Sequence, residues 1–89
     1  MFNSYEDSIN WNRTFIQHQK FHQVMDSKFG IYIGQTLPYR IKFLIPGKDN
    51  TTHQIFWPNK GGISNHSAQL ILKIIKNDLE PFKVKTEIV

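Results

Sequence analysis

The chain has 89 residues, 39% of them hydrophobic and 13% aromatic, which fits one small folded domain (residues 1–89) and argues against disorder. Eleven Lys and Arg against seven Asp and Glu give a net charge of +4 at pH 7, which permits an anionic partner such as nucleic acid without requiring one. Because cysteine is absent, disulfides, thiolate metal sites and a cysteine nucleophile are excluded, and a cytoplasmic location is favoured.

The first predicted element is a helix over residues 4–28. Ser4 and Asp7 have the spacing of a capping box, and apolar side chains recur every three or four residues as far as Phe29. Gly30 is a natural stop. The N-terminus lacks the pattern of a signal peptide and no apolar run approaches the ~20 residues of a membrane span, so we expect no membrane association.

Three extended segments are predicted next. Residues 31–33 form a short apolar run between two glycines, and residues 39–45 alternate between apolar or aromatic side chains and a second set that includes Arg40 and Lys42. Residues 46–50 have strong turn chemistry. Residues 52–57 then alternate again, which predicts two strands joined by this loop.

A second helix is predicted to begin at Ser64 or Asn65, either of which is a suitable N-cap, and to end before Pro81. Apolar side chains on one side of this helix have the spacing of a core-facing surface. The predicted core face consists of Ala68, Ile71, Leu72, Ile75 and Leu79.

The tail, residues 82–89, alternates between apolar and charged side chains and is predicted to be a last strand. Its lysines, Lys83 and Lys85, would discourage further pairing at a sheet edge. The element order α-β-β-β-α-β predicts an α+β fold, in which two helices pack on one face of a mostly antiparallel sheet of three to four strands.

Three histidines are candidates for chemistry. His18 and His22 stand four residues apart on one side of the first helix and could share a zinc ion with a third ligand, although local hydrogen bonding is the favoured interpretation and we expect neither metal nor cofactor. His53 could act as the base of a metal-free ribonuclease, although a solvated or cross-strand-paired imidazole is favoured. Such a ribonuclease would need a phosphate-binding cation from Lys42, Lys48 or Lys60.

Basic residues gather in three places. The second helix carries a polar stripe at steps of three and four residues, and Lys60 precedes it in a glycine-rich loop of a kind that can hold a phosphate. Arg40 and Lys42 form a second basic spot, and Lys83 and Lys85 form a third. The residues predicted to bind nucleic acid are Lys60, His66, Gln69, Lys73, Lys76, Arg40 and Lys42.

A protein partner is the alternative. Small inhibitors that phages and mobile elements direct against host proteins have this size and lack of catalytic pattern, and exposed aromatic side chains on the strands would form their contact surface. The candidates are Tyr32, Tyr39, Phe56 and Trp57. Leu70 and Ile74, beside the core face of the second helix, could form a homodimer seam, so both a monomer and a homodimer stay open.

The element order α-β-β-β-α is similar to that of double-stranded-RNA-binding domains and of the small HicA-type toxin ribonucleases. Ser64 and Ala68 match the positions where those domains open their last helix, but Asn65, His66 and Gln69 replace the basic residues that hold phosphates there. The extra C-terminal strand also departs from the pattern. The resemblance covers about two thirds of the chain by element order and few residues by identity, and it implies nucleic-acid binding.

The sequence therefore predicts a small, non-catalytic module that binds nucleic acid or a nucleoprotein through a basic face. The alternatives are an inhibitor that binds a host protein and a His-dependent ribonuclease toxin.

Overall fold

The computed structural model describes residues 18–30 and 36–89. Within them it contains two helices and an antiparallel sheet of three strands, which agrees with the predicted α+β class. The expected start of the first helix and the extended run at residues 31–33 lie outside the described residues. The elements are α2 (His18–Phe29), β1 (Ile41–Pro46), β2 (Thr52–Trp57), α3 (Asn65–Leu79) and β3 (Lys85–Ile88), with two short 3-10 helices, η2 (Lys48–Asn50) and η3 (Glu80–Phe82).

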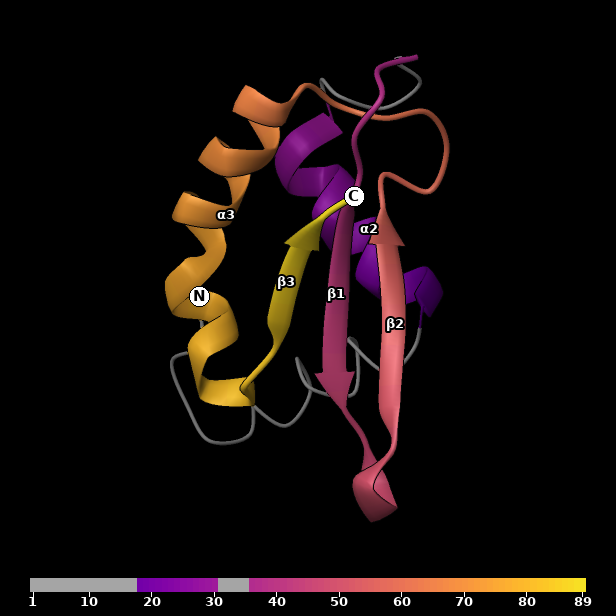
Figure 1. Cartoon of the computed structure of the whole chain (residues 1–89), viewed down its shortest axis with the longest axis vertical. Helices are drawn as coiled ribbons and strands as arrows, with labels where there is room; N and C mark the ends of the chain where they lie inside the picture. Colours follow the sequence, from indigo (N-terminus) through magenta and orange to yellow (C-terminus); the bar gives the residue numbers. More distant parts are fainter. Residues whose placement is uncertain (1–17, 31–35) are drawn as a thin grey trace.

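The central strand of the sheet is β1, which pairs antiparallel with β2 on one side and with β3 on the other (Figure 1). A tight loop joins β1 to β2, and the backbone N–H of Gly47 donates to the carbonyl of Thr51 at 2.8 Å across it. Asp49 and Asn50 adopt left-handed backbone conformations there, which Asp and Asn tolerate better than most residues. On the other side of β1, the pairing with β3 brings together two strands that are far apart in the sequence.

Two strand boundaries differ from the prediction, whereas β2 has the predicted bounds. The first strand begins at Ile41 rather than at Tyr39, because Tyr39 forms backbone hydrogen bonds with Ile63, ahead of α3. The last strand begins only at Lys85, because residues 80–82 form η3 and Lys83 turns the chain in a left-handed conformation (φ 54°).

One hydrophobic core contains side chains of α2, α3, β1 and β2, and we call the side of the strands that bears these side chains the inner face. The Phe21 ring of α2 meets that of Phe43 edge-on at a centroid distance of 4.8 Å, and Phe29 meets Trp57 at 5.7 Å. In Figure 1, α2 lies behind the sheet and α3 lies beyond β3. The inner-face residues are Ile41, Phe43, Ile45, Ile55 and Trp57, and α3 adds Ala68, Ile71, Ile75 and Leu79 to the same core.

The start of α3 is fixed locally. Ser64, one of the two predicted candidates, is its N-cap, and its hydroxyl accepts a 3.1 Å hydrogen bond from the backbone N–H of Ser67. Four of the five predicted core residues of this helix are buried, and the fifth, Leu72, is half-buried against the core. None of the helices in the described part of the chain has the length and apolar character that crossing a membrane requires.

Candidate functional site

The second face of the sheet, which we call the outer face, is where the basic residues of the strands gather. Side chains alternate along a strand, so the neighbours of the core residues point to this side. The register places them in two rows across the sheet. The outer-face residues are Phe56, Lys42 and Glu87 in one row and Gln54, Leu44 and Lys85 in the next.

Arg40 occupies the end of the outer face at which β2 ends. Its backbone is paired with that of Val89 by hydrogen bonds of 2.8 and 2.9 Å. Its guanidinium lies 5.0 Å from the centroid of the Phe56 ring, and its Nε donates to the carbonyl of Pro58 at 3.1 Å. A planar cation is thus held over an aromatic ring and against a backbone oxygen, which fixes its orientation.

Lys42 lies in the middle of the outer face and is paired with Glu87, with a distance of 3.2 Å between Nζ and Oε2. The Lys42 side chain is 21% exposed and that of Glu87 is 52% exposed, so the pair is accessible from solvent. The carboxylate offsets part of the positive field of this face, because opposite charges at this distance attract and cancel at long range.

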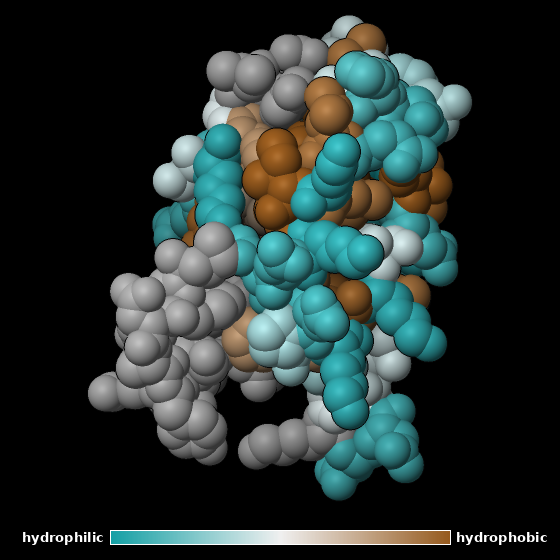
Figure 2. Space-filling model, turned by 90° about the vertical axis from the view of Figure 1, so that its left-hand side faces the viewer, coloured by the Kyte–Doolittle hydropathy of each residue, from teal (hydrophilic) through white to brown (hydrophobic). Residues whose placement is uncertain are grey.

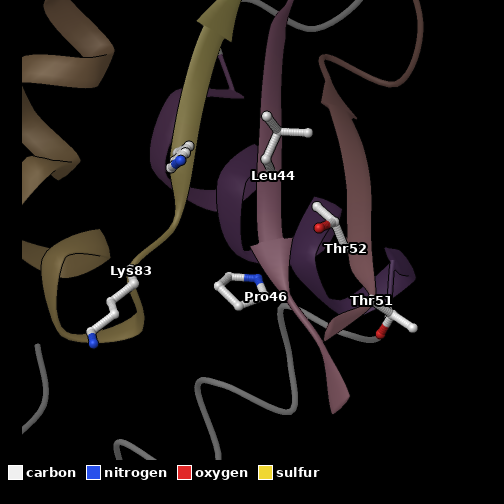
Figure 3. A pocket seen from close by; sticks show the side chains of 6 residues that line it. Leu44, Pro46, Thr51, Thr52 and Lys83 are labelled. Carbon is white, nitrogen blue, oxygen red and sulfur yellow. The ribbon is translucent and has the colours of Figure 1, made fainter. Parts of the chain in front are cut away.

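A shallow pocket of about 300 Å³ opens at the other end of the face, beside the β1–β2 loop. In Figure 3 the side chains of Leu44 and Pro46, on β1, lie between Thr52 and Lys83. Two lysines and two threonines line the pocket around an apolar floor, and none of the lining residues among those that the structure describes is acidic. Of the described residues, the pocket is lined by Leu44, Pro46, Thr51, Thr52, Lys83 and Lys85.

The pocket lysines are exposed, and the salt bridges within residues 18–30 and 36–89 involve neither Lys83 nor Lys85. Their charge is therefore available to an anion. The sequence indicated a basic spot at these two residues. It did not show that Thr51 and Thr52 lie across from them, because that depends on the pairing of β3 with the far side of β1, and β3 is distant from both other strands in the sequence.

The predicted stripe on α3 does not join this face. The four side chains concerned are exposed, as is Lys60 in the loop before the helix. They lie on the exposed side of a helix whose buried side belongs to the core, so they form a separate surface. Figure 2, which views the molecule from the side where α3 lies, shows apolar and polar side chains intermixed. The four residues of the stripe are His66, Gln69, Lys73 and Lys76.

The glycine-rich loop before α3 has a packing role. Gly62 is buried, and a Cβ atom at this position would collide with the carbonyl oxygen of Leu37 and come within 2.7 Å of that of Tyr39. Gly61 has a φ of 72°, which favours glycine. Both glycines are thus explained by the path of the backbone.

His53 lies on the side of β2 that bears Ile55 and Trp57, whereas Lys42 lies on the outer face. Lys60 follows the far end of β2. The structure therefore does not bring His53 together with either of these lysines, two of the three cations considered for a ribonuclease site.

His18 is exposed, whereas His22 is half-buried and its Nδ1 has no hydrogen-bond partner within the described residues. Burial lowers the pKa of His22 below its ordinary value of 6.5, and nearby Asp26 partly counters this effect. Within residues 18–30 and 36–89, no group of three or more His, Cys, Asp or Glu side chains has the arrangement of a metal site.

The aromatic candidates separate into different environments. Tyr32 lies outside the described residues, Tyr39 is 39% exposed, and Phe56 is half-buried beneath Arg40. Trp57 was a candidate for an exposed contact, and this is corrected: its side chain is 0% exposed because it faces the core.

A scan against protein-family models found no match to the chain. Comparisons with curated proteins and with solved structures gave no significant match either.

Proposed function

We propose that the protein is a non-catalytic module that binds nucleic acid through the outer face of its sheet. The observation that carries the proposal is the convergence of Arg40, Lys42 and Lys85 on this face, with Lys83 at the adjoining pocket. Glu87 is the one acidic side chain in the two rows of this face. A surface of this composition has a positive potential that attracts phosphates.

Two of the seven residues predicted to bind nucleic acid, Arg40 and Lys42, belong to this face. The other five lie on α3 and in the loop before it, on a surface where exposed Leu70 and Ile74 interrupt the charges. We therefore assign the main contact to the sheet and use α3 lysines as matched controls.

The test is fluorescence anisotropy with labelled single-stranded and double-stranded DNA and RNA at about 50 and 200 mM salt, because binding that releases counterions weakens steeply over this range. We expect binding that falls by at least tenfold, and a further loss in the double variant Arg40→Ala/Lys85→Ala. The matched double variant Lys73→Ala/Lys76→Ala has the same net charge and should bind more tightly than the sheet variant. Absence of binding at the lower salt concentration would refute the proposal.

A protein partner is the second candidate, and the exposed apolar pair on α3 favours it. Ile74 is 66% exposed and Leu70 is 44% exposed, and they stand one turn apart. Exposed apolar side chains that adjoin one another can mark a site of protein–protein interaction. The discriminating measurement is light scattering of the wild type and of Ile74→Asp, followed by affinity capture with both: loss of a dimer or of one captured protein in the variant would favour this candidate.

We also propose how the helices pack and where in the cell the protein lies. The shared core, in which side chains of α2 and α3 join the inner face, supports the packing of both helices on one side of the sheet. The absence of cysteine supports a cytoplasmic location.

A further inference from the structure

We infer that the ligand of the outer face is a single strand of nucleic acid, which runs along β1 with a base stacked on Arg40 and a phosphate in the pocket of Lys83 and Lys85. The inference rests on the proposed function and adds the form of the ligand and its placement on the sheet.

Arg40 has the features of a stacking platform. Phe56 supports one side of its guanidinium at 5.0 Å, and the hydrogen bond from Nε to the Pro58 carbonyl restrains its rotation. Arg40 is half-buried, so part of it stays accessible to a ligand. Unpaired bases stack on aromatic rings and on guanidinium planes, whereas the bases of a duplex are already stacked on one another. This end of the face therefore favours a single strand.

The pocket at the other end suits a phosphate. Lys83 and Lys85 supply positive charge, and Thr52 supplies a hydroxyl that can donate to a phosphate oxygen. The apolar floor of Leu44 and Pro46 suits a sugar ring rather than a second charge. Within residues 18–30 and 36–89, every charged side chain that lines the pocket is a lysine, so these residues attract an anion.

The two ends are joined by β1. Six residue steps separate Arg40 from Pro46, which corresponds to about 20 Å of strand. A nucleic-acid strand at about 3.4 Å per nucleotide covers this length with roughly six nucleotides when stacked, and with fewer when extended. Lys42 lies on this path, between the two ends, where its ammonium is paired with Glu87.

The experiment compares oligonucleotides of matched length on the full chain. Anisotropy titrations use a labelled deoxythymidine 12-mer, the same backbone with abasic sites in place of its bases, and a 12-base-pair duplex. We expect the wild type to bind the thymidine strand about tenfold more tightly than the abasic strand, because stacking acts through the base. The duplex should bind more weakly than the thymidine strand.

Two sets of variants locate the contacts. Arg40→Lys keeps the positive charge but removes the planar guanidinium on which a base would stack. This variant should therefore bind the thymidine and abasic strands with equal affinity, and the dependence of its affinity on salt should be unchanged. Lys85→Ala and Lys83→Ala should each lower the slope of log affinity against log salt by up to about 0.7, the value for losing one whole phosphate contact of a single strand. Lys76→Ala, on α3, is the control for lost charge and should leave the slope unchanged. Circular dichroism and thermal unfolding of each variant verify its fold.

Each outcome separates the inference from the proposed function. Equal binding of the thymidine strand, the abasic strand and the duplex would overturn the single-strand inference while leaving nucleic-acid binding in place. Unchanged salt slopes in Lys83→Ala and Lys85→Ala would overturn the placement of the phosphate. Failure of the wild type to bind any of the three probes would refute the proposed function itself.

Discussion

The indole nitrogen of Trp57 donates a hydrogen bond of 2.8 Å to a carboxylate oxygen of Asp26. This contact joins the last residue of β2 to the second half of α2, in the same place where the Phe29 ring packs on Trp57. It therefore ties α2 to the end of β2 through two contacts of the same indole.

Replacing Asp26 with Ala should lower the free energy of unfolding by about 1.5–3 kcal/mol, the range for a hydrogen bond to a charged group. Asp26→Asn keeps an acceptor oxygen and should cost less. Urea unfolding, monitored by tryptophan fluorescence, measures the free energy of unfolding of both variants. Equal losses in the two variants would show that the lost charge, rather than the lost acceptor, is responsible.

The ion pair between Lys28 and Asp78, 3.0 Å apart, links α2 to α3. Its carboxylate is buried and its ammonium is not: the Asp78 side chain is 4% exposed and that of Lys28 is 39% exposed. Lys28→Ala leaves a buried carboxylate without its cation and should cost about 3 kcal/mol. Asp78→Ala leaves a lysine that reaches water and should cost nearer 1 kcal/mol. Chemical unfolding checks this order, and a larger loss in Asp78→Ala would contradict it.

Stability should fall as the pH drops below the ordinary pKa of histidine because of His22. Its pKa is lowered by burial, and also by His18 and Arg40, while Asp26 raises it. At a pH between 6.5 and the lowered pKa of the folded state, His22 binds a proton in the unfolded chain but not in the folded chain. The contribution of His22 to the free energy of unfolding is therefore complete above pH 6.5 and is lost as the pH falls through this window.

The measurement is the free energy of unfolding of the wild type and of His22→Gln between about pH 7.5 and 5, the range in which an ordinary histidine titrates. The difference between the two curves should change through this window and level off below the lowered pKa. Curves that stay parallel would show that His22 does not titrate differently on folding.

Gly62→Ala should be strongly destabilising, by more than about 2 kcal/mol, because the added methyl group meets the backbone carbonyls of Leu37 and Tyr39, which cannot rotate away like a side chain. Gly61→Ala is the matched variant, since Gly61 has a left-handed backbone of φ 72°, a conformation that costs an alanine about 1–2 kcal/mol. Thermal unfolding ranks the two. A smaller loss for Gly62→Ala would mean that this segment shifts readily.

Glu87→Gln should strengthen nucleic-acid binding several-fold at low salt. The change removes the carboxylate that lies 3.2 Å from the ammonium of Lys42, which then becomes available to a phosphate. The salt slope should steepen by about 0.7 for this added contact. Glu80→Gln makes the same change in net charge at an exposed residue outside the two rows and the pocket, and it should have the smaller effect. Equal effects would assign the gain to net charge alone.

Local pattern was enough to predict β2 and the core face of α3, and it narrowed the N-cap of α3 to Ser64 or Asn65. Alternation along 52–57 and the three-and-four spacing from Ala68 to Leu79 each follow from the geometry of a single element. A serine hydroxyl three residues before a free amide likewise needs no distant partner. The boundaries of β1 and β3 were less accurate, because Tyr39 pairs with Ile63 and η3 occupies the start of the tail, and both depend on how distant parts of the chain meet.

Which basic residues share a surface was decided by the tertiary structure. The sequence placed three basic spots on three elements, and their spacing within each element says nothing of how those elements are oriented. Pairing of β3 with β1 sets Lys85 beside Leu44 and Glu87 beside Lys42, whereas packing of α3 into the core sends Lys73 and Lys76 to another surface. Strand register and helix docking depend on contacts between residues distant in the sequence, and these contacts created the outer face and its pocket.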